Sequence, residues 1–170
     1  MSLEGLLDEA EYFGFPLRHR FRNTESRFGI LLKGPSGWGE FAPFDDYSDK
    51  VAGRWLAAAL EQSHGSWPTA SRTEIPINGI LPIVDVTETK ALTQEILDRG
   101  MTTIKMKVSD DSATSLENDI ARIAAVRDIA PADTKIRIDV NGSWTVNEAV
   151  VSLKEITSAT GELDYVEQPC

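Results

Sequence analysis

The stretch Thr102-Thr103-Ile104-Lys105-Met106-Lys107-Val108 decides how the rest of the chain is organised. Charged and apolar residues alternate in it, and successive side chains of a strand point to opposite faces. Lys105 and Lys107 therefore share one face, and the other face is apolar. Lysines also protect exposed edge strands from pairing, so this stretch alone fits a structural role as well as a functional one.

Two later stretches repeat this design. Ile136–Asn141 carries Asp139 on a charged face, and Leu163–Pro169 carries Glu167 on one. Lys107, Asp139 and Glu167 follow one another at intervals of about 30 residues, the length of a strand, a crossover helix and two loops. Charge thus recurs at the C-terminal end of each strand, where a parallel β/α barrel carries its active site.

The spacing of apolar residues predicts helices between these strands, over residues 87–99, 112–129 and 146–160. Gly100 and Gly161 are suited to end the first and the third. The alternation of strands and helices predicts a parallel sheet with right-handed crossovers.

One more strand is predicted before the first of these helices, over Ile75–Pro82. Its Asn78 and Gly79 suggest a polar barrel interior that another group approaches closely. Residues 71–170 would then form four β/α units, fewer than a complete barrel of about 250 residues needs.

The first seventy residues follow a different pattern. Residues 28–33 and 38–41 flank a Gly-Pro-Ser-Gly turn and predict a β-hairpin, and residues 49–63 predict a packed helix. We interpret residues 1–70 as a small α+β domain. The basic segment Arg18–Arg22 is interpreted as a solvated loop.

Composition narrows the classes of partner. The 170 residues contain 27 Asp and Glu against 17 Lys and Arg, for a net charge of −10, which disfavours nucleic-acid binding. The single cysteine, Cys170, cannot form an internal disulfide. The acidic N-terminus is neither a signal peptide nor a membrane span, so we expect a soluble, cytoplasmic protein with no membrane partner.

The charged row suggests metal-assisted proton abstraction. The carboxylates of Asp139 and Glu167 lie on adjacent predicted strands and can converge on Mg²⁺, which prefers oxygen ligands. They can equally be ion-pair partners of Arg137. Two neighbouring lysines disfavour each other's charge, so one of Lys105 and Lys107 can act as a neutral base.

These residues resemble the enolase superfamily in its muconate-lactonizing subgroup. The resemblance rests on Lys105-Met106-Lys107, on residues 137–144 (Arg-Ile-Asp-Val-Asn-Gly-Ser-Trp) and on Val166-Glu167-Gln168-Pro169. Residues 37–44 and 75–82 are most similar to o-succinylbenzoate synthases of menaquinone biosynthesis. The fold that this implies is α/β, with an N-terminal α+β capping domain followed by the first half of a modified (β/α)8-type, TIM-like (β/α)7β barrel.

The resemblance also implies a reaction. A Mg²⁺-dependent dehydratase would convert 2-succinyl-6-hydroxy-2,4-cyclohexadiene-1-carboxylate, a dianionic small molecule, to o-succinylbenzoate through an enediolate intermediate. Lys107 would be the base and Lys105 would tune it, while Asp139 and Glu167 would bind the metal.

Other positions receive secondary roles by the same resemblance. Asn141 and Arg137 would support the metal ligands, and Arg20, Phe44 and Tyr47 would line the substrate pocket from the capping domain. The third carboxylate ligand and a second catalytic lysine are expected beyond residue 170. We therefore expect the 170 residues to be the N-terminal portion of a longer synthase and to be inactive alone.

Two alternatives stay open. The same half-site would serve an N-succinylamino acid racemase or a dipeptide epimerase, because both chemistries use the Lys-x-Lys strand and the same metal. The chain can also be an inactive half-barrel fragment. The sequence leaves the oligomeric state undetermined, and a monomer is compatible with it.

Overall fold

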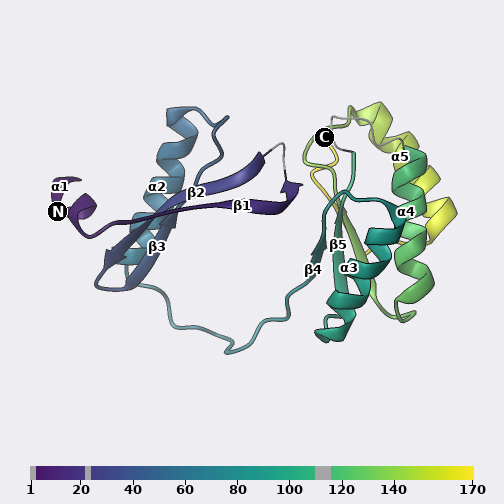
Figure 1. Cartoon of the computed structure of the whole chain (residues 1–170), viewed down its shortest axis with the longest axis horizontal. Helices are drawn as coiled ribbons and strands as arrows, with labels where there is room; N and C mark the ends of the chain where they lie inside the picture. Colours follow the sequence, from purple (N-terminus) through teal and green to yellow (C-terminus); the bar gives the residue numbers. More distant parts are fainter. Residues whose placement is uncertain (1–2, 22–23, 110–115) are drawn as a thin grey trace. The chain divides into compact units, whose positions relative to one another are not determined.

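The computed structural model describes residues 3–21, 24–109 and 116–170. The chain divides into two compact units, Met1–Thr73 and Glu74–Cys170, both drawn in Figure 1. None of the helices in the described ranges is long and apolar enough to cross a membrane.

The first unit is an antiparallel meander with a helix packed on it. After helix α1 (Leu3–Asp8), the strands β1 (Glu11–Phe21), β2 (Thr24–Gly34) and β3 (Gly37–Phe41) pair in that order, and α2 (Asp49–His64) follows. The predicted hairpin and helix are therefore confirmed. The core of this unit joins α1, β2 and α2 through Leu6, Leu32 and Ala59.

Glycine allows α2 to lie close to β3. A Cβ atom at Gly39 would lie 2.0 Å from the carbonyl oxygen of Ala59, far inside van der Waals contact. The absence of a side chain at residue 39 therefore sets how closely helix and strand approach.

Strand β1 corrects the loop expected at Arg18–Arg22. Residues 18–21 belong to the strand, whereas Arg22 lies outside the described residues. Pro16 argues against a strand in a sequence pattern, but β1 is the edge strand of the meander, where a missing N–H is tolerated. The pairing of β1 with β2 is irregular between Pro16 and Phe21.

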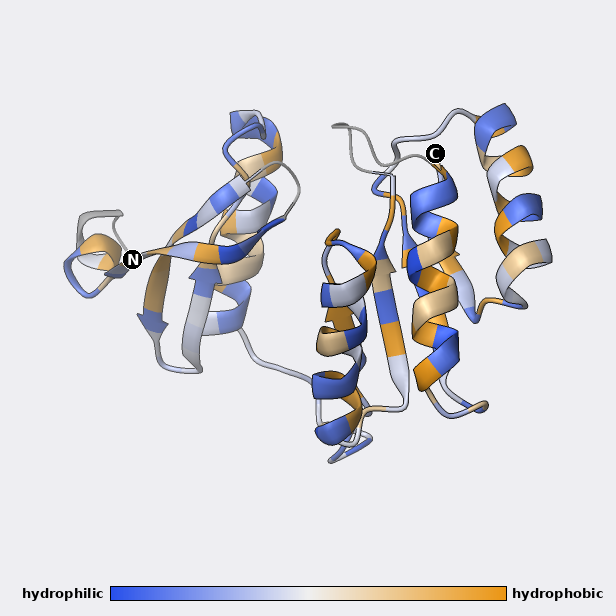
Figure 2. Cartoon of the chain, turned by 45° about the vertical axis from the view of Figure 1, so that its right-hand side comes forward, coloured by the Kyte–Doolittle hydropathy of each residue, from blue (hydrophilic) through white to orange (hydrophobic). Residues whose placement is uncertain are grey.

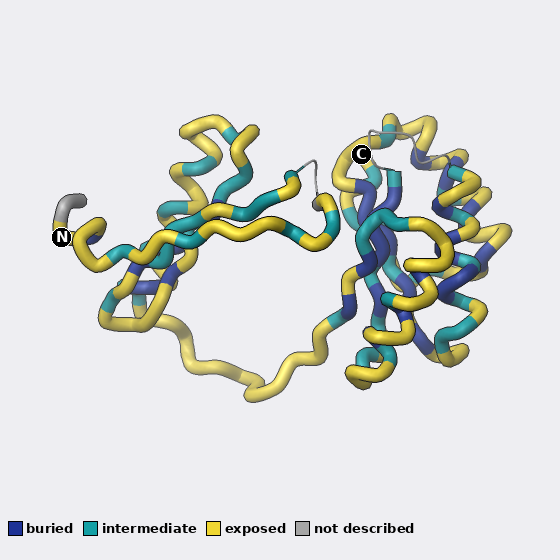
Figure 3. The backbone as a smooth tube through the Cα atoms, viewed as in Figure 1, coloured by how far each residue is buried: buried dark blue, intermediate teal, exposed yellow. Residues whose placement is uncertain are grey.

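Residues 66–77 are exposed and connect the two units without helix or strand (Figure 3). The strand expected over Ile75–Pro82 is wrong in length, because only Gly79–Leu81 pairs, as β4. Ile75 and Ile77 are 73% and 70% exposed. Prolines at residues 76 and 82 cannot donate to a sheet and so confine the strand.

The second unit has the predicted alternation of strands and helices. The order is β4, α3 (Val86–Asp98), β5 (Thr103–Lys107), α4 (Leu116–Ile129), β6 (Lys135–Asp139), α5 (Val146–Thr160) and β7 (Tyr165–Glu167). The four strands pair in parallel in the order β4-β5-β6-β7. The three helices cover one face of this sheet (Figure 1). Of the helix predicted over 112–129, residues 112–115 lie outside the described residues.

The two faces of the sheet differ in chemistry. Along β5 the apolar and charged residues alternate, which Figure 2 shows as orange and blue segments in turn. The helix-covered face is a continuous apolar core. Its fully buried members include Leu81, Ile104, Met106, Ile123, Val126, Ile136, Ile138 and Ile156.

Helix caps follow from the sequence. Asp85 caps α3 by accepting a hydrogen bond from the N–H of Glu88, and Thr145 and Glu148 form a complete capping box on α5. Gly100 and Gly161 have positive φ angles of 78° and 82°, which confirms their predicted place after the helices.

Gly79 lies on the opposite face from the one expected. It pairs with Ile104, whose side chain is in the helix-covered core, and a Cβ atom at residue 79 would lie 2.4 Å from Ile96 Cγ2 of α3. The glycine therefore makes room for a helix, not for the barrel interior.

Candidate active site at the carboxyl ends of the strands

Strand register brings three predicted site residues to one level. Lys107 pairs with Asp139, and Asp139 pairs with Glu167, so the three form a row across β5, β6 and β7. Lys105 lies one step earlier on the same face of β5, because side chains two residues apart share a face. The row occupies the C-terminal ends of the strands on the face opposite the helices.

Lys107 is buried and paired. Its Nζ lies 2.5 Å from Asp139 Oδ2 and 2.8 Å from Asn141 Oδ1. Asp139 is also buried, and its Oδ1 accepts a hydrogen bond of 3.1 Å from the backbone N–H of Asn141. Asn141 has a positive φ of 54°, which asparagine tolerates better than most residues. In this conformation the backbone N–H of Asn141 reaches Asp139, and its side-chain Oδ1 reaches Lys107.

Lys105 connects the two carboxylates. Its Nζ lies 3.0 Å from Glu167 Oε2 and 3.3 Å from Asp139 Oδ2. Asp139 and Glu167 therefore converge on one cationic group, which is the arrangement that the sequence predicted for a bound cation. Within the described residues, no group of three or more His, Cys, Asp or Glu side chains could hold a metal ion.

Pairing decides the protonation of these groups. Burial raises the pKa of the Asp139 carboxyl, but hydrogen bonds and charge from Lys107 and Lys105 and the N–H of Asn141 outweigh it, so this pKa is lowered. Burial lowers the pKa of Lys105, but its hydrogen bonds to Glu167 and Asp139 outweigh it, so this pKa is raised. Its two carboxylate neighbours therefore keep Lys105 charged, and its role in tuning Lys107 as the base stays a prediction.

Arg137 has other partners than those proposed for it. Its Nε lies 2.7 Å from Asp164 Oδ2, its guanidinium stacks 4.7 Å from the ring centroid of Tyr165, and its Nη1 donates to Asn78 Oδ1 at 3.3 Å. It pairs in register with Tyr165, one step before the Asp139–Glu167 level. The guanidinium thus contacts Asp164, Tyr165 and Asn78, and none of these is a member of the charged row.

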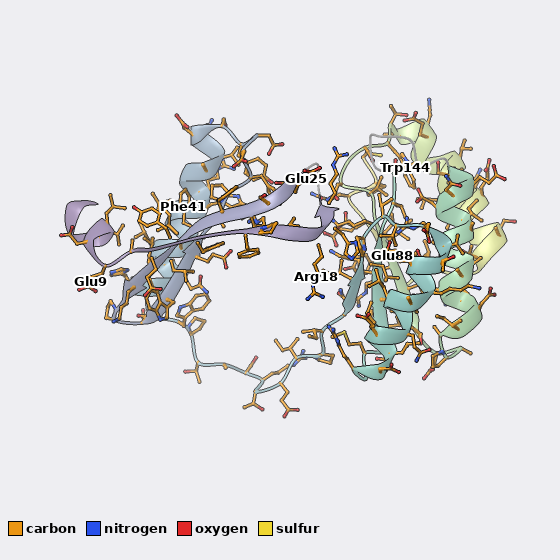
Figure 4. All side chains as sticks on the ribbon, in the orientation of Figure 1. Glu9, Arg18, Glu25, Phe41, Glu88 and Trp144 are labelled. Atoms are coloured by element: carbon orange, nitrogen blue, oxygen red, sulfur yellow. The ribbon has the colours of Figure 1, made fainter. Side chains whose placement is uncertain are left out.

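The predicted pocket residues of the first unit are placed by other contacts. Phe44, Tyr47 and Trp55 form an aromatic cluster with centroid distances of 5.6 to 6.3 Å, and the Arg27 guanidinium lies 4.6 Å from the Phe44 ring. Arg20 lies in β1, as does Arg18, whose side chain is labelled in Figure 4. A substrate-binding role for Arg20, Phe44 and Tyr47 stays a prediction.

Sequence reasoning missed a buried ion pair behind the charged row. Asp119 and Arg122 on α4 are 1% and 2% exposed, and Arg122 Nη1 lies 3.0 Å from Asp119 Oδ1. Burial raises the pKa of Asp119 and lowers the pKa of Arg122, and their mutual attraction opposes both shifts. The signal was present as two opposite charges three residues apart, among the apolar positions of a predicted helix.

Matches to known families cover most of the chain. Residues 13–63 match the family described as Enolase N-terminal domain-like, and residues 88–170 match the one described as Enolase C-terminal domain-like. The two matched ranges fall in the first and the second compact unit respectively.

Curated relatives agree with these families. The chain is 41% identical over 158 residues to the o-succinylbenzoate synthase of Thermobifida fusca, and 40% identical over 171 residues to that of Mycobacterium ulcerans. The alignments cover 93% and 99% of this chain but 48% and 50% of those proteins. The chain thus spans about half the length of the curated relatives that it matches.

Solved structures share the fold. The o-succinylbenzoate synthase of Thermosynechococcus elongatus, solved with Mg in the active site, is 26% identical with a TM-score of 0.59, over 95% of this chain and 60% of that one. The L-Ala-D/L-Glu epimerase of Bacillus subtilis has a TM-score of 0.67 at 19% identity over the same shares. With its N-terminal capping domain and its partial α/β barrel, the chain belongs to the enolase superfamily.

Proposed function

We propose that the natural protein carrying this chain is a Mg²⁺-dependent o-succinylbenzoate synthase of menaquinone biosynthesis. Its substrate would be 2-succinyl-6-hydroxy-2,4-cyclohexadiene-1-carboxylate. The observation that carries the proposal is the contact of the Lys105 ammonium with both Asp139 and Glu167, beside the buried Lys107. Relatives about 40% identical that are named o-succinylbenzoate synthase support the choice of reaction.

The residues of the row fit a magnesium ion. Asp139 and Glu167 would hold it, because both are oxygen donors and both already approach one cationic group. The backbone N–H of Asn141 would orient Asp139. When bound, Mg²⁺ supplies positive charge that stabilises the enediolate character of the substrate carboxylate. A third carboxylate ligand is expected from outside these 170 residues.

Lys107 would move the protons. As a neutral amine it takes the α proton of the substrate, and the electron pair of that C–H bond becomes part of the enediolate. The ammonium then returns the proton to the departing hydroxide as the C–O bond breaks, so water leaves and the ring becomes aromatic. Lys105 would keep positive charge beside the substrate carboxylate.

Three residues of the first unit are proposed to bind the substrate. We propose that Arg20 contacts the dianionic substrate and that Phe44 and Tyr47 form an apolar wall, which suits a six-membered ring. A cytoplasmic location and the absence of nucleic-acid partners belong to the same proposal. The net charge of −10 supports the second, because it disfavours contact with a phosphate backbone.

The test is a turnover assay on the natural full-length polypeptide that contains these residues. We expect Mg²⁺-dependent formation of the aromatic product, and a loss of at least about 100-fold in Lys107→Ala, because general-base catalysis contributes roughly 10²–10⁴-fold. Lys154→Ala is the matched control, since Lys154 is exposed on α5. Full activity in Lys107→Ala would contradict the assignment of the base.

The same assay separates the alternative reaction. Solvent deuterium entering an N-succinylamino acid or a dipeptide, without aromatic product, would identify a racemase or an epimerase and leave the metal and lysine roles in place. We also propose that the 170 residues by themselves give no turnover, because the described residues offer the metal only two carboxylates at this row.

A further inference from the structure

Helix α4 carries a buried ion pair at a place where an apolar core would suffice. Asp119 and Arg122 lie beside fully buried Ile123 and Val126, on the helix-covered face of the sheet. Burying two charges costs several kcal/mol per ion before their attraction offsets it, and well-packed apolar residues are often as stable or more so. The pair therefore calls for an explanation other than stability.

The pair holds the backbone on both sides of Val108. Arg122 Nη1 donates to the carbonyl oxygen of Lys107 at 3.0 Å, and the N–H of Ser109 donates to Asp119 Oδ2 at 3.0 Å. Arg122 Nη2 donates to the carbonyl oxygen of Pro82 at 2.7 Å, which ties in the segment after β4. One ion pair on α4 thus binds the main chain at the end of β5 and the main chain just after β4.

Ser109 shows that this strand end needs holding. Its φ of 57° lies in the left-handed region, which costs about 1–3 kcal/mol for a residue other than glycine unless the surroundings impose it. The hydrogen bond to Asp119 is one such constraint, and the hydroxyl of Ser143, which donates to the Ser109 carbonyl oxygen at 2.9 Å, is another. The main chain therefore holds a strained conformation two residues after the strand that carries the two lysines.

We propose that Asp119 and Arg122 are positioning residues for Lys107. They hold the main chain of residues 107 and 109 from the helix side, so that the Lys107 side chain leaves on the opposite face at the height of Asp139 and Asn141. The proposal rests on the proposed function in one respect, that Lys107 is the base. Besides each other, their hydrogen-bond partners among the described residues are the main-chain groups of Pro82, Lys107 and Ser109.

The chain offers a matched control on the same helix. Arg127 donates from Nε to the carbonyl oxygen of Thr160 at 3.2 Å and from Nη1 to that of Thr134 at 3.3 Å, and Nη2 donates to that of Glu162. Thr134 and Glu162 precede β6 and β7, so this arginine binds carbonyls at the other end of the strands. It shares the chemistry of Arg122 without the proximity to Lys107.

The first experiment compares Arg122→Met, Arg122→Lys and Arg127→Met in the full-length polypeptide. We expect kcat to fall about 10–100-fold in Arg122→Met with KM within about threefold, because a misplacement of 1 Å can cost 10²-fold. Arg122→Lys should recover part of kcat, and Arg127→Met should keep it within about twofold. Equal losses of kcat in the two methionine variants would overturn the proposal.

A double variant separates a loss of stability from a loss of positioning. Asp119→Leu/Arg122→Met replaces both charges with apolar side chains, which restores packing without leaving either charge unpaired. We expect the double variant to have a higher free energy of unfolding than Arg122→Met. Its kcat should be as low as that of Arg122→Met. Recovery of kcat together with stability would show a purely structural role and overturn the proposal.

A second readout does not depend on turnover. The buried, hydrogen-bonded Lys107 side chain should give a distinct lysine side-chain NMR signal, assigned by its loss in Lys107→Arg. We expect the signal to persist in Arg127→Met and to broaden or vanish in Arg122→Met. If wild-type protein makes no product and the signal still responds, the proposed function fails and the positioning role stands. If wild-type protein is active and the signal is unchanged in Arg122→Met, the positioning role fails and the function stands.

Discussion

At the scale of single residues, Asp139 has three polar contacts to lose. Its carboxylate binds the ammonium groups of Lys107 and Lys105 and the N–H of Asn141. We predict that Asp139→Asn in the full-length polypeptide abolishes product formation, because it removes a proposed metal ligand and an ionic partner of both lysines. Glu117→Gln on α4, a change outside the row, is the matched control and should retain activity. Mg²⁺-dependent product formation in Asp139→Asn above about 10% of wild type would contradict the role.

Two glycines of the first unit should respond to alanine with opposite signs. At Gly39 a Cβ atom would lie 2.0 Å from the Ala59 carbonyl oxygen, so Gly39→Ala should destabilise this unit by about 1–3 kcal/mol. At Gly53, within α2, a Cβ atom would meet no heavy atom within 4 Å, so Gly53→Ala should stabilise it by about 0.5–1 kcal/mol. Urea unfolding of both variants measures the difference. A stable Gly39→Ala would show that α2 does not pack on β3 this closely.

At the scale of elements, the start of α5 depends on its capping box. Thr145 Oγ1 accepts from the N–H of Glu148, and the Glu148 carboxylate accepts from the N–H of Thr145. Thr145→Ala should lower the free energy of unfolding by about 1 kcal/mol, whereas Thr145→Ser should retain most of it. Equal unfolding midpoints for the two variants would exclude a contribution from the cap.

The capping box also predicts a pH dependence. Hydrogen bonds from the backbone N–H and the side chain of Thr145 hold the pKa of Glu148 below its ordinary value of 4.5. A carboxyl with a lowered folded pKa adds stability above its unfolded pKa and loses it as the pH falls through the folded pKa. The stability advantage of wild type over Glu148→Gln should therefore shrink as the pH is lowered below 4.5. An advantage that is constant across this range would contradict the hydrogen bond.

The elements also show why some predictions failed. The alternation in β5, β6 and β7 could be predicted, because a strand whose two faces differ must alternate. Residues 18–21 were interpreted as part of a solvated loop, and only the structure shows that they belong to β1, an edge strand that tolerates Pro16. Gly79 was assigned to the wrong face because its register against Ile104 is a property of the pairing.

At the scale of the whole molecule, the metal should act on one unit. If Asp139 and Glu167 bind Mg²⁺ as proposed, the metal should slow hydrogen exchange of the backbone amides in β6 and β7. A ligand that binds only the folded state stabilises it by about 2.7 kcal/mol at 100 times its Kd. Exchange in α2 of the first unit should not change. The comparison uses the full-length polypeptide with Mg²⁺ and with chelator. Protection that persists in Asp139→Asn would place the metal elsewhere.

The sequence by itself determined which residues are charged, which share a strand face and at what interval the β/α units recur, because these follow from backbone periodicity and segment length. It thereby predicted the row of Lys107, Asp139 and Glu167. Only the tertiary structure decided which groups these charged side chains bind. Lys105 between two carboxylates, Arg137 on Asp164, and Arg122 on the carbonyl of Lys107 all join residues far apart in the sequence. The physical reason is that an ion pair depends on distances of a few ångströms, which strand register and helix packing set and local sequence does not.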